Sequence, residues 1–174
     1  PEIVRDVDFQ FIPEKRCYVN IITGKPISSN EYDFGLPFNN SLAKVQRCEK
    51  WGYISHDGTE VIPCWYEIFD DFENGVAKVR REGKWGYVDV SGDEIIECKY
   101  EQIGSFNDGC AKVNCFGKWG YINEDGSEVV PCIYEIFDDF KNGVAKVRRD
   151  GKWGYVDVSG DEIIECKYEQ IDPF

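Results

Sequence analysis

Short segments in which apolar and polar residues alternate run along most of the chain. One predicted strand places Ala77 and Val79 on one face and Lys78 and Arg80 on the other. A period of two is typical of β-strands, in which successive side chains point to opposite faces. Turn glycines interrupt the alternation again and again, as at Gly83. The segments between them are too short for an ordinary helix, so the pattern predicts an all-β protein.

The turns between the expected strands carry their own signal. Asn74-Gly75 and Asn142-Gly143 predict tight hairpins, because both residue types tolerate a positive φ. Pro63 and Pro131 fall inside another predicted strand, which we therefore expect at a sheet edge or bulged there. Residues 68–72 form either a fourth short strand or a loop. Each unit of the chain thus offers three or four strands.

The alternating segments belong to a 34-residue repeat. Trp-Gly pairs begin at Trp51, Trp85, Trp119 and Trp153 without a slip in spacing. Such regularity predicts one tandem-repeat domain whose units bury their apolar faces against their neighbours. The units counted from the tryptophans are an N-terminal capping or completing strand at 1–16, a degenerate first repeat at 17–50, full repeats at 51–84, 85–118 and 119–152, and a partial C-terminal repeat at 153–174.

The ends of the array differ from its middle. We expect a strand over Val7 to Ile12, turning at Pro13-Glu14. In the first repeat Cys17 takes the tryptophan position, and Gly24 takes the position of the turn glycine. Divergence of this kind is typical of a capping unit, whose outer face meets water.

The repeated string Gly83-Lys84-Trp85-Gly86-Tyr87-Val88-Asp89, followed by Ser91-Gly92, Glu94-Ile95-Ile96 and Tyr100, resembles the WG-repeat (KWG-repeat) family of bacterial tandem β-repeat proteins. The resemblance covers residues 50–174 well and 17–49 weakly. It implies an all-β array that often lies beside other domains and has no general enzymatic activity. The family has no established catalytic residues to carry over. The chain departs from the motif at Cys17-Tyr18, which stands in place of Trp-Gly.

Two architectures are compatible with such units. We favour tandem β-meander or hairpin repeats stacked as an open solenoid or superhelix, because each unit is too small to bury its aromatic face alone. The alternative is a closed five-bladed β-propeller, in which the N-terminal segment would complete the partial C-terminal repeat. The divergent first repeat argues against equivalence around a ring.

The charge of the chain argues against some partners. Thirty-three acidic and 20 basic residues give a net charge of −13, which repels nucleic-acid phosphates and anionic lipid surfaces. We therefore expect neither nucleic-acid nor membrane binding. The sequence contains no apolar run of membrane-spanning length and no recognisable signal peptide, although it begins at Pro1 and contains no methionine, which leaves room for an upstream segment.

Eight cysteines raise the question of a disulfide framework. Four of them occupy one repeat position and are called the repeat cysteines: Cys64, Cys98, Cys132 and Cys166. The others, Cys17, Cys48, Cys110 and Cys115, follow no pairing rule. We favour reduced thiols that fill small apolar sites, which slightly favours a cytoplasmic location, over disulfides in an exported protein. No histidine accompanies the repeat cysteines at a fixed spacing, so we expect no metal site and no cofactor.

Acidic residues provide the most tempting candidates for chemistry. Turns such as Asp89 to Glu94 contain carboxylates and a glycine, but their spacing does not match known calcium loops. Phe69-Asp70-Asp71-Phe72 and its copy at 137–140 suggest the paired carboxylates of a glycosidase. Wholesale duplication of an active site would be odd, so we favour solvated loops anchored by phenylalanines. His56 is the only histidine and is interpreted as a surface variation, so we expect no catalytic residue and no enzyme.

The repeated aromatic residues are the remaining candidate site. We expect the tryptophans to form mainly inter-repeat core. The candidate binding or structural aromatics are Trp51, Trp85, Trp119, Trp153, Tyr53, Tyr87, Tyr121 and Tyr155. The first hypothesis for function is a non-catalytic protein-interaction or scaffold module with a protein partner. The alternative is a carbohydrate- or choline-like ligand-binding repeat domain that uses exposed tryptophan and tyrosine.

Overall fold

The structure, a computed structural model, describes residues 4–172. Within this range it contains 19 β-strands and two short 3-10 turns, and no α-helix. The all-β prediction is therefore confirmed. No helix in residues 4–172 is long and apolar enough to cross a membrane.

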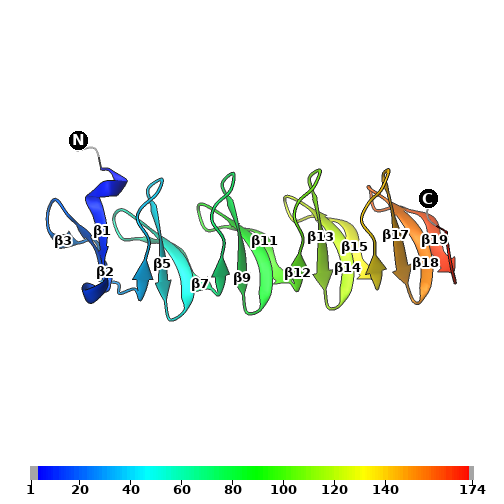
Figure 1. The fold of residues 1–174 in the computed structure, drawn as a ribbon, viewed down its shortest axis with the longest axis horizontal. Coiled ribbons are helices and arrows are strands. Elements are labelled where there is room, and N and C mark those ends of the chain that lie inside the picture. The colour runs from blue at the N-terminus through cyan, green and yellow to red at the C-terminus, as the bar shows by residue number, and fades with distance from the viewer. Residues whose placement is uncertain (1–3, 173–174) are drawn as a thin grey trace. The chain divides into compact units, whose positions relative to one another are not determined.

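Four sheets share one design, in which four strands follow each other in chain order. Figure 1 shows each group as neighbouring arrows of continuous colour. The strands are β4 Phe34–Gly35, β5 Leu42–Arg47, β6 Lys50–Ser55 and β7 Glu60–Tyr66; β8 Ile68–Phe69, β9 Val76–Arg81, β10 Lys84–Asp89 and β11 Glu94–Tyr100; β12 Gln102–Ile103, β13 Cys110–Cys115, β14 Lys118–Asn123 and β15 Glu128–Tyr134; β16 Ile136–Phe137, β17 Val144–Arg149, β18 Lys152–Asp157 and β19 Glu162–Tyr168.

The residues divide into two compact units. One holds the described residues up to 83 together with 87–94, and the other holds 84–86 together with 95–172. The boundary passes through the sheet of β8 to β11. The sheets of β4–β7 and β12–β15 each lie wholly within one unit and show the repeat most clearly.

The sheets are out of phase with the repeats counted from the tryptophans. Trp119 lies near the middle of the sheet that begins at Gln102 and ends at Tyr134. Each sequence unit therefore contributes strands to two successive sheets. The segment after Tyr66 opens a sheet with the short strand β8, which settles the choice between strand and loop for Ile68 and Phe69.

The last strand of each sheet is bulged. In the sheet of β12–β15, Trp119 pairs with Tyr134 and Tyr121 with Val130, and the register shifts between these pairs. Pro131 lies in the shifted segment of the edge strand β15. A proline has no backbone N–H to donate to a ladder, so an edge or bulge is where it fits. The prediction for Pro63 and Pro131 is confirmed, since β7 repeats the same register shift.

The expected hairpin turns are present. Asn142 has φ 52° and Gly143 has φ 81°, and the residues on either side of them, Lys141 and Val144, form a bridge. Asn74 and Gly75 adopt the same conformation, with φ values of 51° and 84°. Two central residues at positive φ match the right-handed twist of the strands they join.

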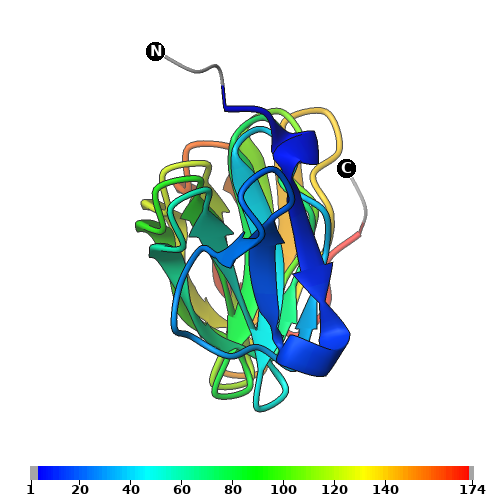
Figure 2. The same cartoon turned by 90° about the vertical axis from the view of Figure 1, so that its left-hand side faces the viewer.

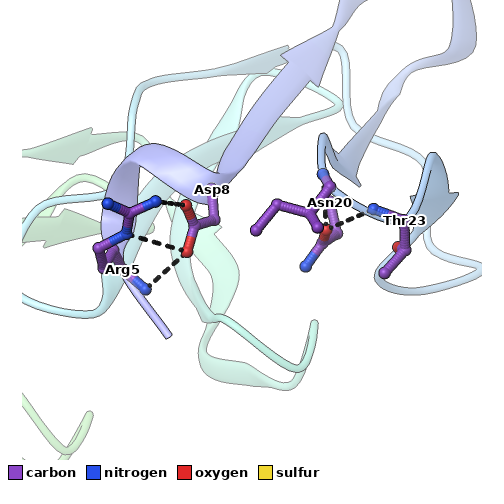
Figure 3. Close-up of polar contacts among 5 residues, drawn as sticks. Arg5, Asp8, Asn20 and Thr23 are labelled. Atoms are coloured by element: carbon purple, nitrogen blue, oxygen red, sulfur yellow. Dashed lines mark hydrogen bonds and ion pairs between the residues drawn. The ribbon is translucent and has the colours of Figure 1, made fainter. Parts of the chain in front are cut away.

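The N-terminal sheet consists of three strands, β1 Phe9–Ile12, β2 Cys17–Asn20 and β3 Lys25–Pro26. Figure 2 shows β1 running between the two 3-10 turns, Asp6–Asp8 and Pro13–Lys15. The predicted strand thus begins at Phe9 and not at Val7, because Asp8 forms a closed turn with Arg5. The Arg5 guanidinium and backbone N–H both donate to the Asp8 carboxylate (Figure 3).

Figure 3 also shows how the β2–β3 turn is closed. The Asn20 side-chain oxygen accepts hydrogen bonds from the backbone N–H groups of Ile22 and Thr23, each at 3.0 Å. Such a side-chain acceptor replaces a backbone turn bond, which is why asparagine favours this position. The first strand of the degenerate first repeat, β2, thus has a defined end.

The best-buried side chains of a sheet lie on the face that carries the glycine of the Trp-Gly pair. In the sheet of β16–β19, Ala145, Val147 and Val156 are at most 1% exposed and belong to one cluster. Tyr134 and Phe137 join that cluster from the end of the preceding sheet and the start of this one. Successive sheets therefore share apolar surface, as expected for a repeat unit that cannot bury its own face.

Candidate functional site

The glycine of each Trp-Gly pair is required by the bulged strand that crosses it. A Cβ atom at Gly120 would lie 2.4 Å from the Val130 carbonyl oxygen and 2.8 Å from the Cys132 backbone nitrogen. Gly52 and Gly154 meet the same obstacle, at 2.3 and 2.4 Å from a backbone carbonyl oxygen. The missing side chain lets β15 fold over β14, which places the repeat cysteine of that strand against β13.

The tryptophan next to each glycine points to the other face and is half-buried. A lysine covers one side of the indole: the Lys112 Nζ lies 4.9 Å from the Trp119 ring centroid, and the Lys146 Nζ lies 4.4 Å from the Trp153 centroid. The Trp119 indole also packs against the apolar cluster that contains Tyr121 and Val147. On the face of β14 opposite the glycine, the buried side chain is Tyr121 and not the indole.

The same lysine joins one sheet to the next. The Lys112 ammonium donates to the Phe137 carbonyl oxygen, and Lys44 donates to the Phe69 carbonyl oxygen in the same way. Lys44 is only 13% exposed, so this bond also provides an acceptor for a charge that has lost most of its water. The lysine of the Ala-Lys-Val segment is therefore a structural contact between sheets.

The tyrosine of the motif contacts the Phe-Asp-Asp-Phe loop of the next sheet. The Tyr121 ring lies 4.9 Å from both Phe137 and Phe140 between ring centroids, and Phe137 and Phe140 pack against each other at 5.7 Å. Tyr53 makes the same contacts with Phe69 and Phe72. The interpretation of these loops as anchored by their phenylalanines is confirmed.

The second carboxylate of each Phe-Asp-Asp-Phe loop lies in solvent. The side chains of Asp71 and Asp139 are 92% and 87% exposed. They are duplicates of one loop position, and neither is enclosed by apolar side chains. A glycosidase acid needs a raised pKa, which burial in an apolar pocket commonly supplies, so this geometry gives the paired-carboxylate hypothesis no support.

A second repeated constellation joins a tyrosine, a glutamate and an arginine, and is called the Tyr–Glu–Arg cluster. The Tyr134 hydroxyl donates to Glu162 Oε1 at 2.9 Å, and the Arg149 guanidinium forms an ion pair with the same carboxylate. The Arg149 guanidinium also lies 5.8 Å from the centre of the Tyr134 ring. The other complete copies are Tyr32 with Glu60 and Arg47, and Tyr66 with Glu94 and Arg81.

This cluster joins successive sheets through a buried tyrosine and two partly exposed charged side chains. Tyr134 belongs to β15 and is 2% exposed, whereas Glu162 and Arg149 belong to the next sheet. Burial raises the pKa of the Tyr134 hydroxyl above its ordinary value of 10.0, and the bond to Glu162 adds to that rise. Sequence reasoning missed the cluster, although the constant separation of 28 positions from tyrosine to glutamate could have indicated it.

The acidic turns bind their own backbone. Asp89 Oδ1 accepts the backbone N–H groups of Ser91 and Asp93 at 2.8 and 3.0 Å, and Asp157 closes its turn in the same way. In another turn, hydrogen bonds from Ser55 and Thr59 lower the pKa of Asp57 to about 2. No group of three or more metal-ligating side chains gathers within residues 4–172. The carboxylates of Asp89 and Asp157 thus close their own turns.

His56 is not the surface variation that the sequence indicated. Its ring stacks on Phe9 at 4.6 Å, lies 4.6 Å from Phe38, and its Nε2 is 2.8 Å from an Asp6 carboxylate oxygen. The side chain is 18% exposed. Asp6 precedes it by 50 positions in the sequence, so no local pattern could reveal the contact. The histidine fixes the N-terminal sheet against the next sheet.

Comparisons with known proteins identify the repeat. A family model described as WG containing repeat matches residues 51–85, 85–119, 119–153 and 153–174. No curated protein matches the chain in sequence.

Similarity to solved structures is weak. Hsv2 of Kluyveromyces lactis is 12% identical, with 90% of this chain and 62% of that one covered and a TM-score of 0.35. For Hsv2 of Kluyvelomyces marxianus the identity is 10%, the coverages are 87% and 56%, and the TM-score is 0.36. A protein of unknown function from Bacteroides caccae is 13% identical, with coverages of 85% and 88% and a TM-score of 0.25. The chain spans less than two thirds of the two Hsv2 structures.

Proposed function

Because this chain belongs to the WG-containing repeat family, we propose that it is a non-catalytic protein-interaction or scaffold module. The observation that carries the proposal is that the repeated charged and hydroxyl side chains bind other groups of the array itself. In the last copy Tyr134 is hydrogen-bonded to Glu162 of the next sheet, Arg149 is ion-paired with the same carboxylate, and Lys146 is hydrogen-bonded to the Ile171 carbonyl oxygen. A repeat array built in this way presents a periodic surface to a partner.

The exposed charge indicates what kind of partner fits that surface. Asp71 and Asp139 stand almost fully in solvent, on loops that their phenylalanines anchor, and the chain as a whole carries a net charge of −13. Exposed carboxylates steer and orient a basic surface, mainly by raising the association rate. We therefore propose a protein partner with a lysine- or arginine-rich face.

Neutralising variants test this partner chemistry. Asp71→Asn and Asp139→Asn keep the size of each side chain and remove its charge, and the ion pairs lost with Lys44 and Lys112 are long, at 3.6 and 3.9 Å. Exposed pairs of this kind contribute roughly 0–1 kcal/mol, so the fold should survive. The immobilised chain and the double variant are compared for salt-dependent capture of partners from cells of the source organism. Equal capture by both, or capture of acidic proteins, would contradict the proposal.

The half-buried tryptophans favour one alternative, a binder of choline-like or carbohydrate ligands. Trp119 packs against the apolar cluster that contains Tyr121 and Val147 and lies beneath Lys112, and the exposed remainder of its half-buried indole is the surface on which a ligand would stack. Acrylamide quenching measures how open the indoles are, and titration with choline and with neutral oligosaccharides measures binding directly. We expect weak quenching and no saturation. A saturable change in tryptophan fluorescence would instead establish the ligand-binding alternative.

A further inference from the structure

One copy of the Tyr–Glu–Arg cluster has lost its arginine. The position held by Arg47, Arg81 and Arg149 in the other copies holds Cys115. The tyrosine of that copy, Tyr100, is 0% exposed, and its hydroxyl is buried with no hydrogen-bond partner. Its cluster is therefore incomplete, and a thiol stands where a guanidinium stands elsewhere.

The fold places a second thiol at the same point. In the first copy burial raises the pKa of the thiol of the repeat cysteine, Cys64, to about 11, and the charge and backbone N–H of the neighbouring Arg47 act against that rise. In the incomplete copy the backbone N–H of Cys115 acts in the same way on the pKa of the Cys132 thiol. The contact between arginine and repeat cysteine has thus become a contact between two cysteines.

The glycine bulge explains why strands that are not adjacent in the sheet can meet here. β15 folds over Gly120 of β14, so the Cys132 sulfur lies 4.0 Å from the Val113 carbonyl oxygen of β13. Cys115 lies two residues further along β13, on the same face of the strand as Val113. Both thiols also act on the buried Tyr100 hydroxyl and add to the rise in its pKa that burial causes.

We propose that Cys115 and Cys132 form an oxidative modification site that closes to an intramolecular disulfide when the protein meets hydrogen peroxide. A disulfide requires Cα atoms within about 7 Å and side chains directed toward each other. The crossing of β15 over Gly120 brings β15 close to β13. Cys115 lies on the same face of β13 as Val113, whose carbonyl oxygen the Cys132 sulfur approaches, so the two thiols are directed toward each other. Both residues are half-buried, so a small oxidant reaches them while larger thiols are hindered.

The reaction takes place in two steps that balance. The Cys115 thiolate attacks one peroxide oxygen, the O–O bond breaks, and Cys115 becomes a sulfenic acid as hydroxide leaves and takes up a proton. The Cys132 sulfur then attacks the sulfenic sulfur. The S–S bond forms as the S–O bond breaks, and the Cys132 proton leaves with the hydroxyl as water. Two thiols and one peroxide thus give one disulfide and two waters.

The order of the two cysteines follows from their surroundings. Burial raises the pKa of the Cys132 thiol to about 11, and the Cys115 thiol and Glu128 add to the rise. The thiolate is the form that reacts with peroxide, so Cys132 is a poor first target and acts as the resolving thiol. The disulfide would link β13 to β15, the same two strands that the ion pair between Arg149 and Glu162 links in the last copy as β17 and β19.

Peptide mapping of the intact chain tests the proposal. Cleavage after lysine and arginine places Cys110, Cys115 and Cys132 in three different peptides, 100–112, 113–118 and 119–141. After a small excess of hydrogen peroxide, alkylation of the remaining thiols and digestion, we expect 113–118 joined to 119–141. Dithiothreitol should separate them, and the oxidised chain should melt at a higher temperature than the reduced chain.

Two variants serve as controls. Cys115→Arg rebuilds the cluster of the other copies, so it should fold, keep its Cys132 thiol through the peroxide treatment and show no change in melting temperature on oxidation. Cys110→Ser should form the same linked peptides as the unaltered chain. The proposal fails if both peptides are recovered alkylated and separate, if the linkage uses Cys110, or if the exposed Cys48 joins two chains first.

Discussion

The Tyr134 hydroxyl donates a hydrogen bond to Glu162 Oε1 at 2.9 Å, from the last strand of one sheet to the last strand of the next. The Tyr100 hydroxyl occupies the equivalent place in the preceding copy and has no partner. The two tyrosines can therefore be compared directly. They share a repeat position and are similarly buried, but only the Tyr134 hydroxyl has a hydrogen-bond partner.

We expect Tyr134→Phe to destabilise the protein by about 1–3 kcal/mol, because a bond to a charged acceptor is lost. Tyr100→Phe should be neutral or stabilising, since it removes a buried hydroxyl that lacks a partner. Urea unfolding of both variants measures the difference. Equal destabilisation by the two changes would mean that the Tyr134 bond contributes nothing beyond the ring itself.

The glycine of the Trp-Gly pair should be the least replaceable residue of the motif. We expect Gly120→Ala to cost on the order of 2 kcal/mol or more, because the new methyl group would meet the Val130 carbonyl oxygen at 2.4 Å and backbone cannot yield as a side chain can. Gly104→Ala is the control. Its Cβ would lie 3.4 Å from the nearest atom, so it should change stability by less than about 0.5 kcal/mol. Thermal melting of the two variants decides the matter, and a fully stable Gly120→Ala would show that β15 does not cross β14 so closely.

The buried tyrosines and cysteines predict a loss of stability in alkali. Burial raises the pKa of Tyr100 and Tyr121 from 10.0 to about 12, and of Cys64 and Cys132 from 9.0 to about 11. The unfolded chain therefore releases these protons at lower pH than the folded chain and binds fewer of them above pH 9. The stabilising contribution of these groups is complete below the unfolded pKa values and is lost as the pH rises through the folded ones.

Circular dichroism and the absorbance of tyrosinate, followed together, measure this effect. We expect the folded signal to fall and the buried tyrosines to ionise in the same transition, between pH 10 and pH 12. Independent titration of all the tyrosines near their ordinary pKa, with the fold intact, would contradict the burial of these hydroxyls.

The sequence predicts those features of the fold that depend on local patterns. A period of two, the Asn142-Gly143 pair and Pro131 are each governed by the backbone preferences of a few neighbouring residues, and strand, turn and bulge follow from them. Contacts between sheets instead join residues that are far apart in the sequence. The bond from Tyr134 to Glu162 spans 28 positions and the contact of His56 with Asp6 spans 50, so neither leaves a local signature.

The half-burial of Trp119 escaped prediction for a related reason. Alternation separates the two faces of β14 correctly, but it cannot say how completely the next sheet covers each of them. On the glycine face, Ala111 and Ile122 are fully buried. On the other face the Phe-Asp-Asp-Phe loop covers Tyr121 through its contacts with Phe137, and the indole beside it is left half-buried, with a lysine over its ring.

The number of repeats should be adjustable, and deletion of residues 85–118 tests this. Lys84 then precedes Trp119, as Lys118 does in the unaltered chain, so the motif is unbroken at the junction. Tyr66 comes to stand before Glu128 at the separation that the other tyrosines keep from their glutamates, with Arg81 between them at the arginine position. The deletion thus removes the incomplete cluster of Tyr100 and keeps the cluster of Tyr66 and Arg81, with Glu128 in place of Glu94.

We expect this shortened chain to be a soluble, folded monomer if the repeats form an open stack. Nearest-neighbour energetics then predicts a loss of about one repeat and one interface in stability. In a closed five-bladed propeller the same deletion removes a blade, and the ring must close with a changed curvature or exchange strands between chains. Small-angle scattering distinguishes these results, since a stack becomes shorter along one axis while a broken ring unfolds or assembles into oligomers. A folded monomer supports the extended surface that a scaffold requires, whereas an oligomer or unfolded chain would place any partner on one face of a ring.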